Sequence, residues 1–118
     1  MNIDQFIQAY ITCALWASTD DQGEPLDAAY SIDDIHAVTL VDMHSDCIAF
    51  LKAAGALLDA SGMSSAQAGH DFWLSRNGHG AGFYDRGLRQ CGEDLHALAA
   101  AMGSADLYVG DDQQLHSV

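Results

Sequence analysis

Apolar residues recur every three or four positions in three segments of the chain, and this spacing is the feature that most restricts its fold. The segments cover residues 3–18, 37–60 and 87–102. In each of them the spacing places the apolar side chains on one face of an α-helix. The sequence therefore predicts three helices, whose apolar faces must be buried in a common core.

Residues at the ends of these segments support the assignment. Asn2, with Gln5 three positions later, is a typical helix start. Gly62 follows the second segment and Gly103 follows the third, where a glycine can take the left-handed conformation that ends a helix. Residues 19–30 contain four acids and the one proline of the chain, so we expect a loop there.

The periodicity changes at His70. Residues 71–76 are rich in aromatic side chains, Asn77-Gly78 is a strong turn dipeptide, and the apolar residues 81–84 follow. This pattern is typical of a β-hairpin with a glycine-rich tip.

Near the end of the chain, Leu107 and Val109 alternate with polar or half-polar neighbours, which predicts a further strand, and a short fourth strand follows near Leu115. The expected fold class is α+β, in the order ααββαβ(β). A small antiparallel sheet of three or four strands would be covered by about three helices. At 118 residues, with no repeat or linker, the chain is expected to form a single domain over residues 1–118.

The charge of the chain is far from balanced. Seventeen acids stand against four bases, a formal net charge of −13, and residues 1–51 hold nine acids and no lysine or arginine. Such a chain is repelled by nucleic acid and by anionic membranes, and attracted to basic surfaces. Solubility alone is the simplest explanation of this acidity.

Two further features concern the location of the protein. No run approaches the roughly 20 apolar residues that a membrane span needs, and residues 1–10 carry Asp4 but no base, unlike a secretory signal. We therefore expect a protein of the cytoplasm. Cys13, Cys47 and Cys91 are widely spaced and odd in number, so they are expected to be buried thiols and not a disulfide framework or a metal knuckle.

The segment from His70 to Gly87 gathers two His, two Asp, two Arg and four Gly into 18 residues. An anion or nucleotide could bind there to backbone N–H groups and to Arg76 and Arg86, with His79 beside them. Two other chemical hypotheses are a metal site that uses the histidines of this segment and acid–base catalysis by His79. The histidine spacing matches no standard metal site, however, and a histidine at a turn tip is hard to shield from water.

A structural role explains more of the same segment. The glycines permit a turn and tight packing, the aromatic residues supply core, and the arginines tie the hairpin to the acidic body through ion pairs. We therefore expect no catalytic residues, no metal site and no cofactor, and keep Arg76, His79 and Arg86 as the alternative ligand site.

An acidic cluster is the second candidate site. Six carboxylates fall within 15 residues, with no base among them: Asp20, Asp21, Glu24, Asp27, Asp33 and Asp34. Aspartate is common in turns, but this number exceeds what turns require. The cluster is therefore predicted to be a recognition surface for a basic partner.

The sequence resembles a family of small acidic proteins encoded by bacteriophages, prophages and bacterial chromosomes. The resemblance lies in residues 14–16, 20–27, 30–35, 70–87 and 107–112, and its most specific part is the motif H-D-F-W-L-x-R-N-G-H-G-A-G-F-x-D-R-G of residues 70–87. Tyr84 stands where the family usually has tryptophan. The resemblance implies a phage or mobile-element protein and brings no settled activity with it.

Together these observations predict a non-enzymatic acidic binding protein, an inhibitor or adaptor of a host protein that handles nucleic acid. An anti-CRISPR or antirestriction protein that mimics DNA phosphates is one form of it, because carboxylates can occupy a basic groove as phosphates do. The partner would be a host protein with a basic surface, with no direct contact to nucleic acid or membrane. The alternatives are a small-molecule or nucleotide-binding protein or enzyme that uses Arg76, His79 and Arg86, and a housekeeping interaction module.

Overall fold

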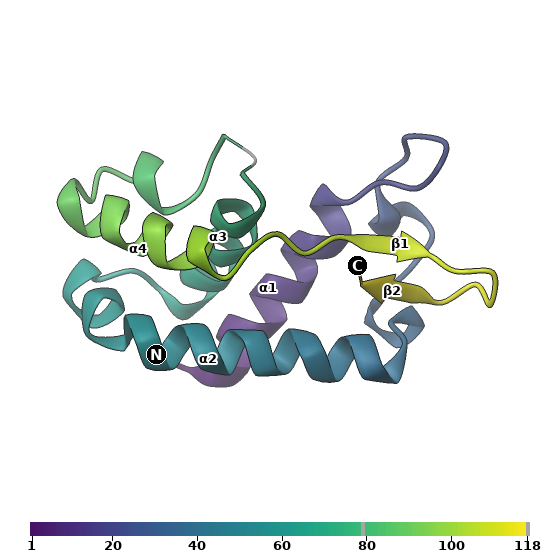
Figure 1. Cartoon of the computed structure of the whole chain (residues 1–118), viewed down its shortest axis with the longest axis horizontal. Coiled ribbons are helices and arrows are strands. Elements are labelled where there is room, and N and C mark those ends of the chain that lie inside the picture. Colours follow the sequence, from purple (N-terminus) through teal and green to yellow (C-terminus); the bar gives the residue numbers. More distant parts are fainter. Residues whose placement is uncertain (79, 118) are drawn as a thin grey trace.

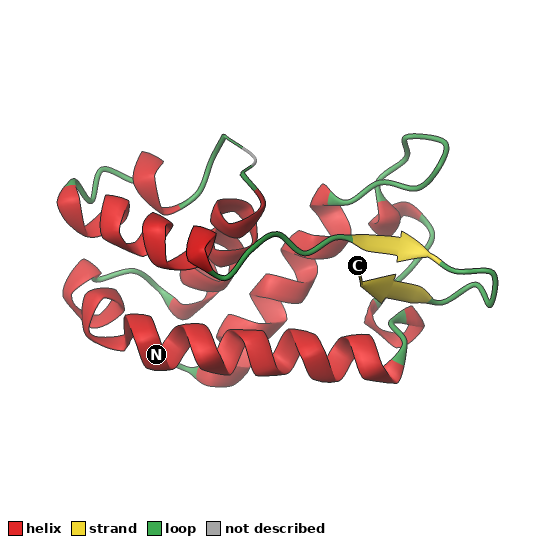
Figure 2. Ribbon diagram, viewed as in Figure 1, coloured by secondary structure: helices red, strands yellow, loops and turns green. Residues whose placement is uncertain are grey.

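Four α-helices carry most of the chain in the computed structural model, which describes residues 1–78 and 80–117. The helices are α1 (Ile3–Ala17), α2 (Ala37–Ser61), α3 (Ser65–Asn77) and α4 (Gln90–Ala101). Strands β1 (Leu107–Val109) and β2 (Leu115–Ser117) form an antiparallel pair. Three one-turn 3-10 helices complete the described elements: η1 (Leu26–Ala28), η2 (Ile32–Asp34) and η3 (Phe83–Asp85). Figure 2 shows helix dominating the fold.

The elements are spread along an elongated molecule of 42 × 24 × 21 Å. Helix α2 runs along the long axis (Figure 1), with α3 and α4 toward one end and the β1–β2 pair toward the other. The loop that joins α1 to α2 lies at the same end as the strands (Figure 1). No helix within the described residues is long and apolar enough to cross a membrane.

The expected α+β fold with a sheet of three or four strands is wrong. The segment predicted to be a β-hairpin forms α3 and the turn η3, so the sheet described has only two strands. Asn77-Gly78 ends the helix and does not turn a hairpin: Gly78 has a φ of 66°, and its N–H reaches the carbonyls of Leu74 and Ser75. The segment had no helical periodicity because residues 71–76 are all buried, which leaves no polar face to read.

The other predicted elements are confirmed. Helices α1, α2 and α4 lie within a few residues of the predicted 3–18, 37–60 and 87–102, and the strands appear where Leu107–Val109 and Leu115 predicted them. Asn2 caps α1 by accepting a hydrogen bond from the Gln5 N–H.

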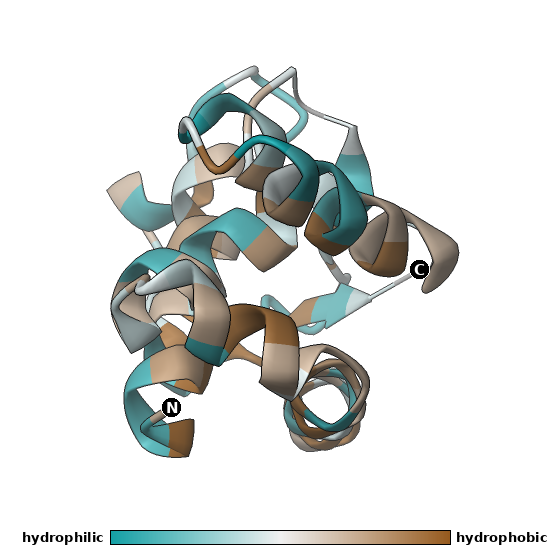
Figure 3. Ribbon diagram, turned by 90° about the vertical axis from the view of Figure 1, so that its left-hand side faces the viewer, coloured by the Kyte–Doolittle hydropathy of each residue, from teal (hydrophilic) through white to brown (hydrophobic). Residues whose placement is uncertain are grey.

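Aromatic side chains from three helices form the centre of the core. Phe6 of α1, Phe50 of α2 and Phe72 of α3 are fully buried, and the rings of Phe50 and Phe72 stack with centroids 4.2 Å apart. Tyr10 adds a stacked ring 5.0 Å from Phe72. Such pairs stabilise the core beyond the area they bury. Figure 3 views the helices from the end opposite the strands and shows apolar and polar stretches mixed along each helix.

Helices α1 and α3 pack at very short range because of one glycine. A Cβ atom added to Gly69 would overlap the carbonyl oxygen of Phe6. Only a residue without a side chain allows the two backbones to approach so closely. This contact sets the position of α3, and hence of every side chain that α3 contributes to the sites below.

Candidate functional site

Arg76, near the end of α3, is the centre of a buried polar network. One terminal nitrogen of its guanidinium donates to the Tyr10 hydroxyl at 3.0 Å and to Asp46 Oδ2 at 2.8 Å. Its Nε donates to the Gly103 carbonyl at 2.8 Å, and the other terminal nitrogen to the Met102 carbonyl at 3.3 Å. Only 4% of the Arg76 side chain is exposed. The network therefore ties α3 to α1, to α2 and to the end of α4.

Burial and charge act in opposite directions on this network. Burial by itself lowers the pKa of Arg76, but its neighbours Tyr10 and Asp46 raise it, so the guanidinium stays charged. Burial raises the pKa of Tyr10 well above its ordinary value, although the Arg76 charge opposes that shift. Arg76 and Tyr10 thus keep their usual protonation, so a charged guanidinium donates to a neutral phenol and to Asp46.

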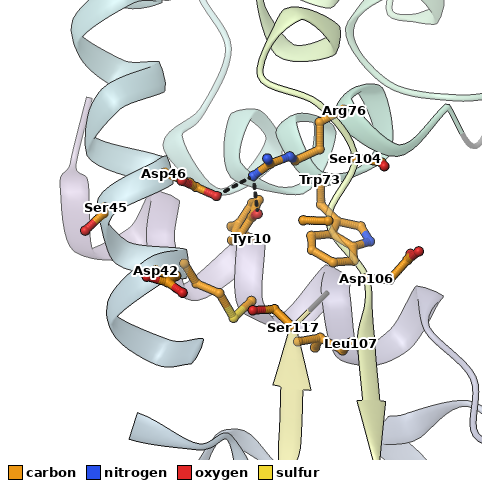
Figure 4. A pocket seen from close by; sticks show the side chains of 12 residues that line it. Tyr10, Asp42, Ser45, Asp46, Trp73, Arg76, Ser104, Asp106, Leu107 and Ser117 are labelled. Atoms are coloured by element: carbon orange, nitrogen blue, oxygen red, sulfur yellow. Dashed lines mark hydrogen bonds and ion pairs between the residues drawn. The ribbon is translucent and has the colours of Figure 1, made fainter. Parts of the chain in front are cut away.

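A pocket of about 390 Å³ opens beside this network (Figure 4). Its polar lining comes from three parts of the chain: α2, the connection between α4 and β1, and the end of β2. The lining carries three carboxylates and three hydroxyl-bearing serines, namely Asp42, Asp46, Asp106, Ser45, Ser104 and Ser117. Tyr10, Trp73 and Arg76 form the floor. The pocket is therefore a polar cavity in which acceptors outnumber donors.

The indole of Trp73 is an exception to the rule that buried polar groups are paired. Trp73 is 1% exposed, and its Nε1 has no hydrogen-bond partner among the described residues. In Figure 4 the nitrogen points toward the side of the pocket formed by Ser104 and Asp106. A buried donor without an acceptor costs about 1–3 kcal/mol, so this wall of the pocket offers an unused hydrogen bond.

Arg86 forms a separate ion pair with Asp71. Its Nε and one terminal nitrogen donate to the two carboxylate oxygens of Asp71 at 3.0 and 2.8 Å. Asp71 is fully buried, whereas 35% of the Arg86 side chain is exposed. The hydrogen bond to Asp71 raises the pKa of Arg86. Gln67 also donates to Asp71 at 3.0 Å, which leaves this carboxylate well satisfied.

Arg76 and Arg86, two of the three residues of the predicted alternative ligand site, line different pockets. Arg76 lines the polar pocket, whereas Arg86 lines two open pockets on the α1–α3 side, one of them of about 590 Å³ beside Trp16. Each arginine is engaged by its own carboxylate. His79 lies outside the described residues. Within the described part of the chain, no group of three or more His, Cys, Asp or Glu side chains could hold a metal ion.

The six acids of the predicted recognition surface lie in the loop between α1 and α2, and they divide into two kinds. Asp20 accepts hydrogen bonds from the N–H groups of Gln22 and Glu24, and Asp34 accepts one from the N–H of Ser31. These two shape the loop. The remaining four make no side-chain hydrogen bond among the described residues and are exposed: Asp21, Glu24, Asp27 and Asp33.

The tip of the β1–β2 pair adds acids at the same end of the molecule. Asp111 and Asp112 are exposed in the turn between the strands. Both oxygens of Asp112 lie 3.0 Å from His116 Nε2, and this hydrogen bond lowers the pKa of Asp112. His116 also stacks on His36 with ring centroids 4.9 Å apart. We call the α1–α2 loop and this tip the acidic end (Figure 1).

Sequence reasoning missed the polar pocket. Tyr10, Asp46 and Arg76 lie far apart in the chain, and no local pattern links them. The pocket depends on α3, which was predicted as strands, so its arginine could not be placed against α2. One signal of α3 was present: Ser64 is followed three positions later by Gln67, and the Ser64 hydroxyl accepts a hydrogen bond from the Gln67 N–H.

Comparisons of the chain with protein-family models, with curated proteins and with solved structures found no match.

Proposed function

We propose that this protein is a non-enzymatic acidic binding protein that engages a partner with a basic surface through its acidic end. The observation that carries the proposal is the distribution of charge. The acidic end gathers exposed carboxylates, while residues 1–51 contain no lysine or arginine. An exposed surface of one sign attracts a surface of the opposite sign and speeds their encounter.

The placement of the arginines supports the same proposal. Arg76 and Arg86, two of the four bases, are engaged by Asp46 and Asp71. They therefore do little to offset the field of the exposed acids. They are also poorly available as an anion-binding pair, so we do not propose the small-molecule or nucleotide alternative.

The partner class follows from the chemistry of the surface and from the resemblance to phage-encoded proteins. Proteins that handle nucleic acid have basic grooves for phosphates, and binding in such grooves is weakened by salt. A surface of carboxylates competes for the same groove. We propose a host nucleic-acid-handling protein as the partner, a CRISPR or restriction complex among the candidates, with the present chain as its inhibitor or adaptor.

The first experiment captures the partner. The tagged protein is incubated with host lysate and washed at low and at high salt, and a nucleic-acid-binding protein released at high salt is the expected result. Neutralising the four exposed loop acids tests the surface itself, with Asp20 and Asp34 left in place because they shape the loop. The variant carries Asp21→Asn, Glu24→Gln, Asp27→Asn and Asp33→Asn.

A matched control variant removes the same charge elsewhere, through Asp4→Asn, Asp59→Asn, Glu93→Gln and Asp94→Asn, all of them exposed. Exposed ion pairs contribute about 0.2–1 kcal/mol each, so the loop variant should bind its partner about fourfold to about a thousandfold more weakly. The control should lose much less. Equal losses would show that net charge alone governs binding, and would contradict a role for the acidic end.

A further inference from the structure

The polar pocket beside Arg76 has a strong preference for positive charge. Asp42, Asp46 and Asp106 line it, and Arg76 is the one basic residue in its lining. Asp42 and Asp106 are exposed and belong to different elements, α2 and the segment before β1. Neither makes a side-chain hydrogen bond among the described residues. Two carboxylates therefore face the cavity without a cationic partner.

Arg76 does not change this preference, because its own hydrogen-bonding capacity is used. Four of its five N–H groups are donated to Tyr10, Asp46 and the carbonyls of Met102 and Gly103. With 4% of its side chain exposed, it has no free face with which to bind an anion. The groups left for a ligand are thus mainly acceptors.

One buried donor of the lining, Nε1 of Trp73, has no partner among the described residues and is directed to the Ser104 and Asp106 side of the cavity (Figure 4). A ligand that fits must bring a cation to the carboxylates and a hydrogen-bond acceptor to this indole. An amino-acid residue with a basic side chain brings both, because its backbone carbonyl lies a few bonds from its charged end. A volume of about 390 Å³ is at the small end of ligand pockets.

We propose that this pocket receives one arginine side chain of the partner, with its guanidinium attracted by the carboxylates of the lining and its backbone carbonyl accepting from Trp73 Nε1. Arginine suits the site better than lysine, because its planar fork of donors can pair with a carboxylate through two parallel hydrogen bonds. This inference deepens the proposed function by naming the residue that the partner inserts.

The two tryptophans of the chain give a direct test. In a ¹H–¹⁵N spectrum each indole N–H gives one signal, and Trp16→Phe identifies the signal of Trp73. Nα-acetyl-arginine amide is the probe, and Nα-acetyl-citrulline amide is the neutral control of almost the same shape. The arginine probe should shift the Trp73 signal in a saturable way and leave the Trp16 signal, which belongs to another pocket, nearly unchanged.

Variants then test the carboxylates. Asp42→Asn and Asp106→Asn should each weaken binding of the arginine probe by about two- to fivefold. Glu93→Gln, an equal charge change at an exposed position of α4, should have no such effect. An equal response to the citrulline probe, no response of Trp73, or an equal response of both tryptophans would each overturn the inference.

Failure here is distinguishable from failure of the proposed function. If a partner is captured and is lost on neutralising the acidic loop, but the arginine probe leaves Trp73 unchanged, the acidic surface stands and the arginine pocket falls. If the probe binds as expected but no basic partner is captured, the pocket stands and the proposed function falls.

Discussion

Replacing Arg86 by methionine should destabilise the fold more than replacing its partner Asp71 by asparagine, although both changes remove the same ion pair. The reason is the unequal burial of the two charges. Asp71 is fully buried, whereas about a third of the Arg86 side chain is exposed, 35% against 0%. The group that is left behind therefore meets a different environment in each variant.

The magnitudes follow from what remains around each group. In Arg86→Met the buried Asp71 carboxylate keeps the hydrogen bond from Gln67 and a His70 nitrogen 3.5 Å away, but no arginine. A buried charge that loses its partner costs about 3–5 kcal/mol. In Asp71→Asn the guanidinium can be hydrated, and Asp85 lies 3.7 Å away. The free energy of unfolding should then fall by about 1–2 kcal/mol, because only hydrogen bonds to a partly exposed group are lost.

Urea denaturation measures the difference. With a slope of about 2 kcal/mol per M, Arg86→Met should lower the midpoint by about 2 M and Asp71→Asn by about 0.5–1 M. The double variant should lie closer to Asp71→Asn than to Arg86→Met, because it no longer strands the carboxylate. Equal midpoints for the two single variants, or the reverse order, would refute the reasoning from burial.

Two further predictions concern other parts of the fold. Gly69→Ala should destabilise the protein by about 1–3 kcal/mol, because the added Cβ overlaps the Phe6 carbonyl. Gly55→Ala should stabilise α2 by about 0.5–1 kcal/mol, because its added Cβ meets nothing within 4 Å. If the denaturation midpoints of both variants move in the same direction, the close approach of α1 and α3 is contradicted. Because the hydrogen bond from His116 lowers the pKa of Asp112 in the folded protein, Asp112 contributes stability that is present above its ordinary pKa of 3.8 and is lost as the pH falls through the lower, folded value. Asp112→Asn should therefore flatten the acid limb of a plot of melting temperature against pH, and an unchanged limb would show that this pair does not act on folding.

The amphipathic helices and the short strands could be predicted from the sequence, because each has one buried face and one face exposed to solvent. Helix α2 keeps a repeat of three to four residues and ends at Gly62, whose φ of 71° matches the left-handed stop expected of it. For α3 this reasoning failed. A helix buried on nearly all sides has no polar stripe, and its aromatic run resembles a strand.

Of the candidate sites, too, one could be predicted from the sequence and the other could not. The acids of the α1–α2 loop could be found from sequence because their number and spacing are local. The polar pocket could not, because Tyr10, Asp46 and Arg76 are far apart in the chain and are joined only when α1, α2 and α3 pack. Ion pairs of Arg76 and Arg86 with acids of the protein were predicted from the sequence. Their partners, Asp46 for Arg76 and Asp71 for Arg86, became known only from the structure.

The division of the loop acids into two kinds bears on how such a surface evolves. Asp20 and Asp34 hold the loop backbone through hydrogen bonds to N–H groups, so changes at these two positions carry a folding cost. Four other acids make no side-chain hydrogen bond among the described residues: Asp21, Glu24, Asp27 and Asp33. Mutation can therefore vary the charge pattern at these four positions while the conformation of the loop stays intact.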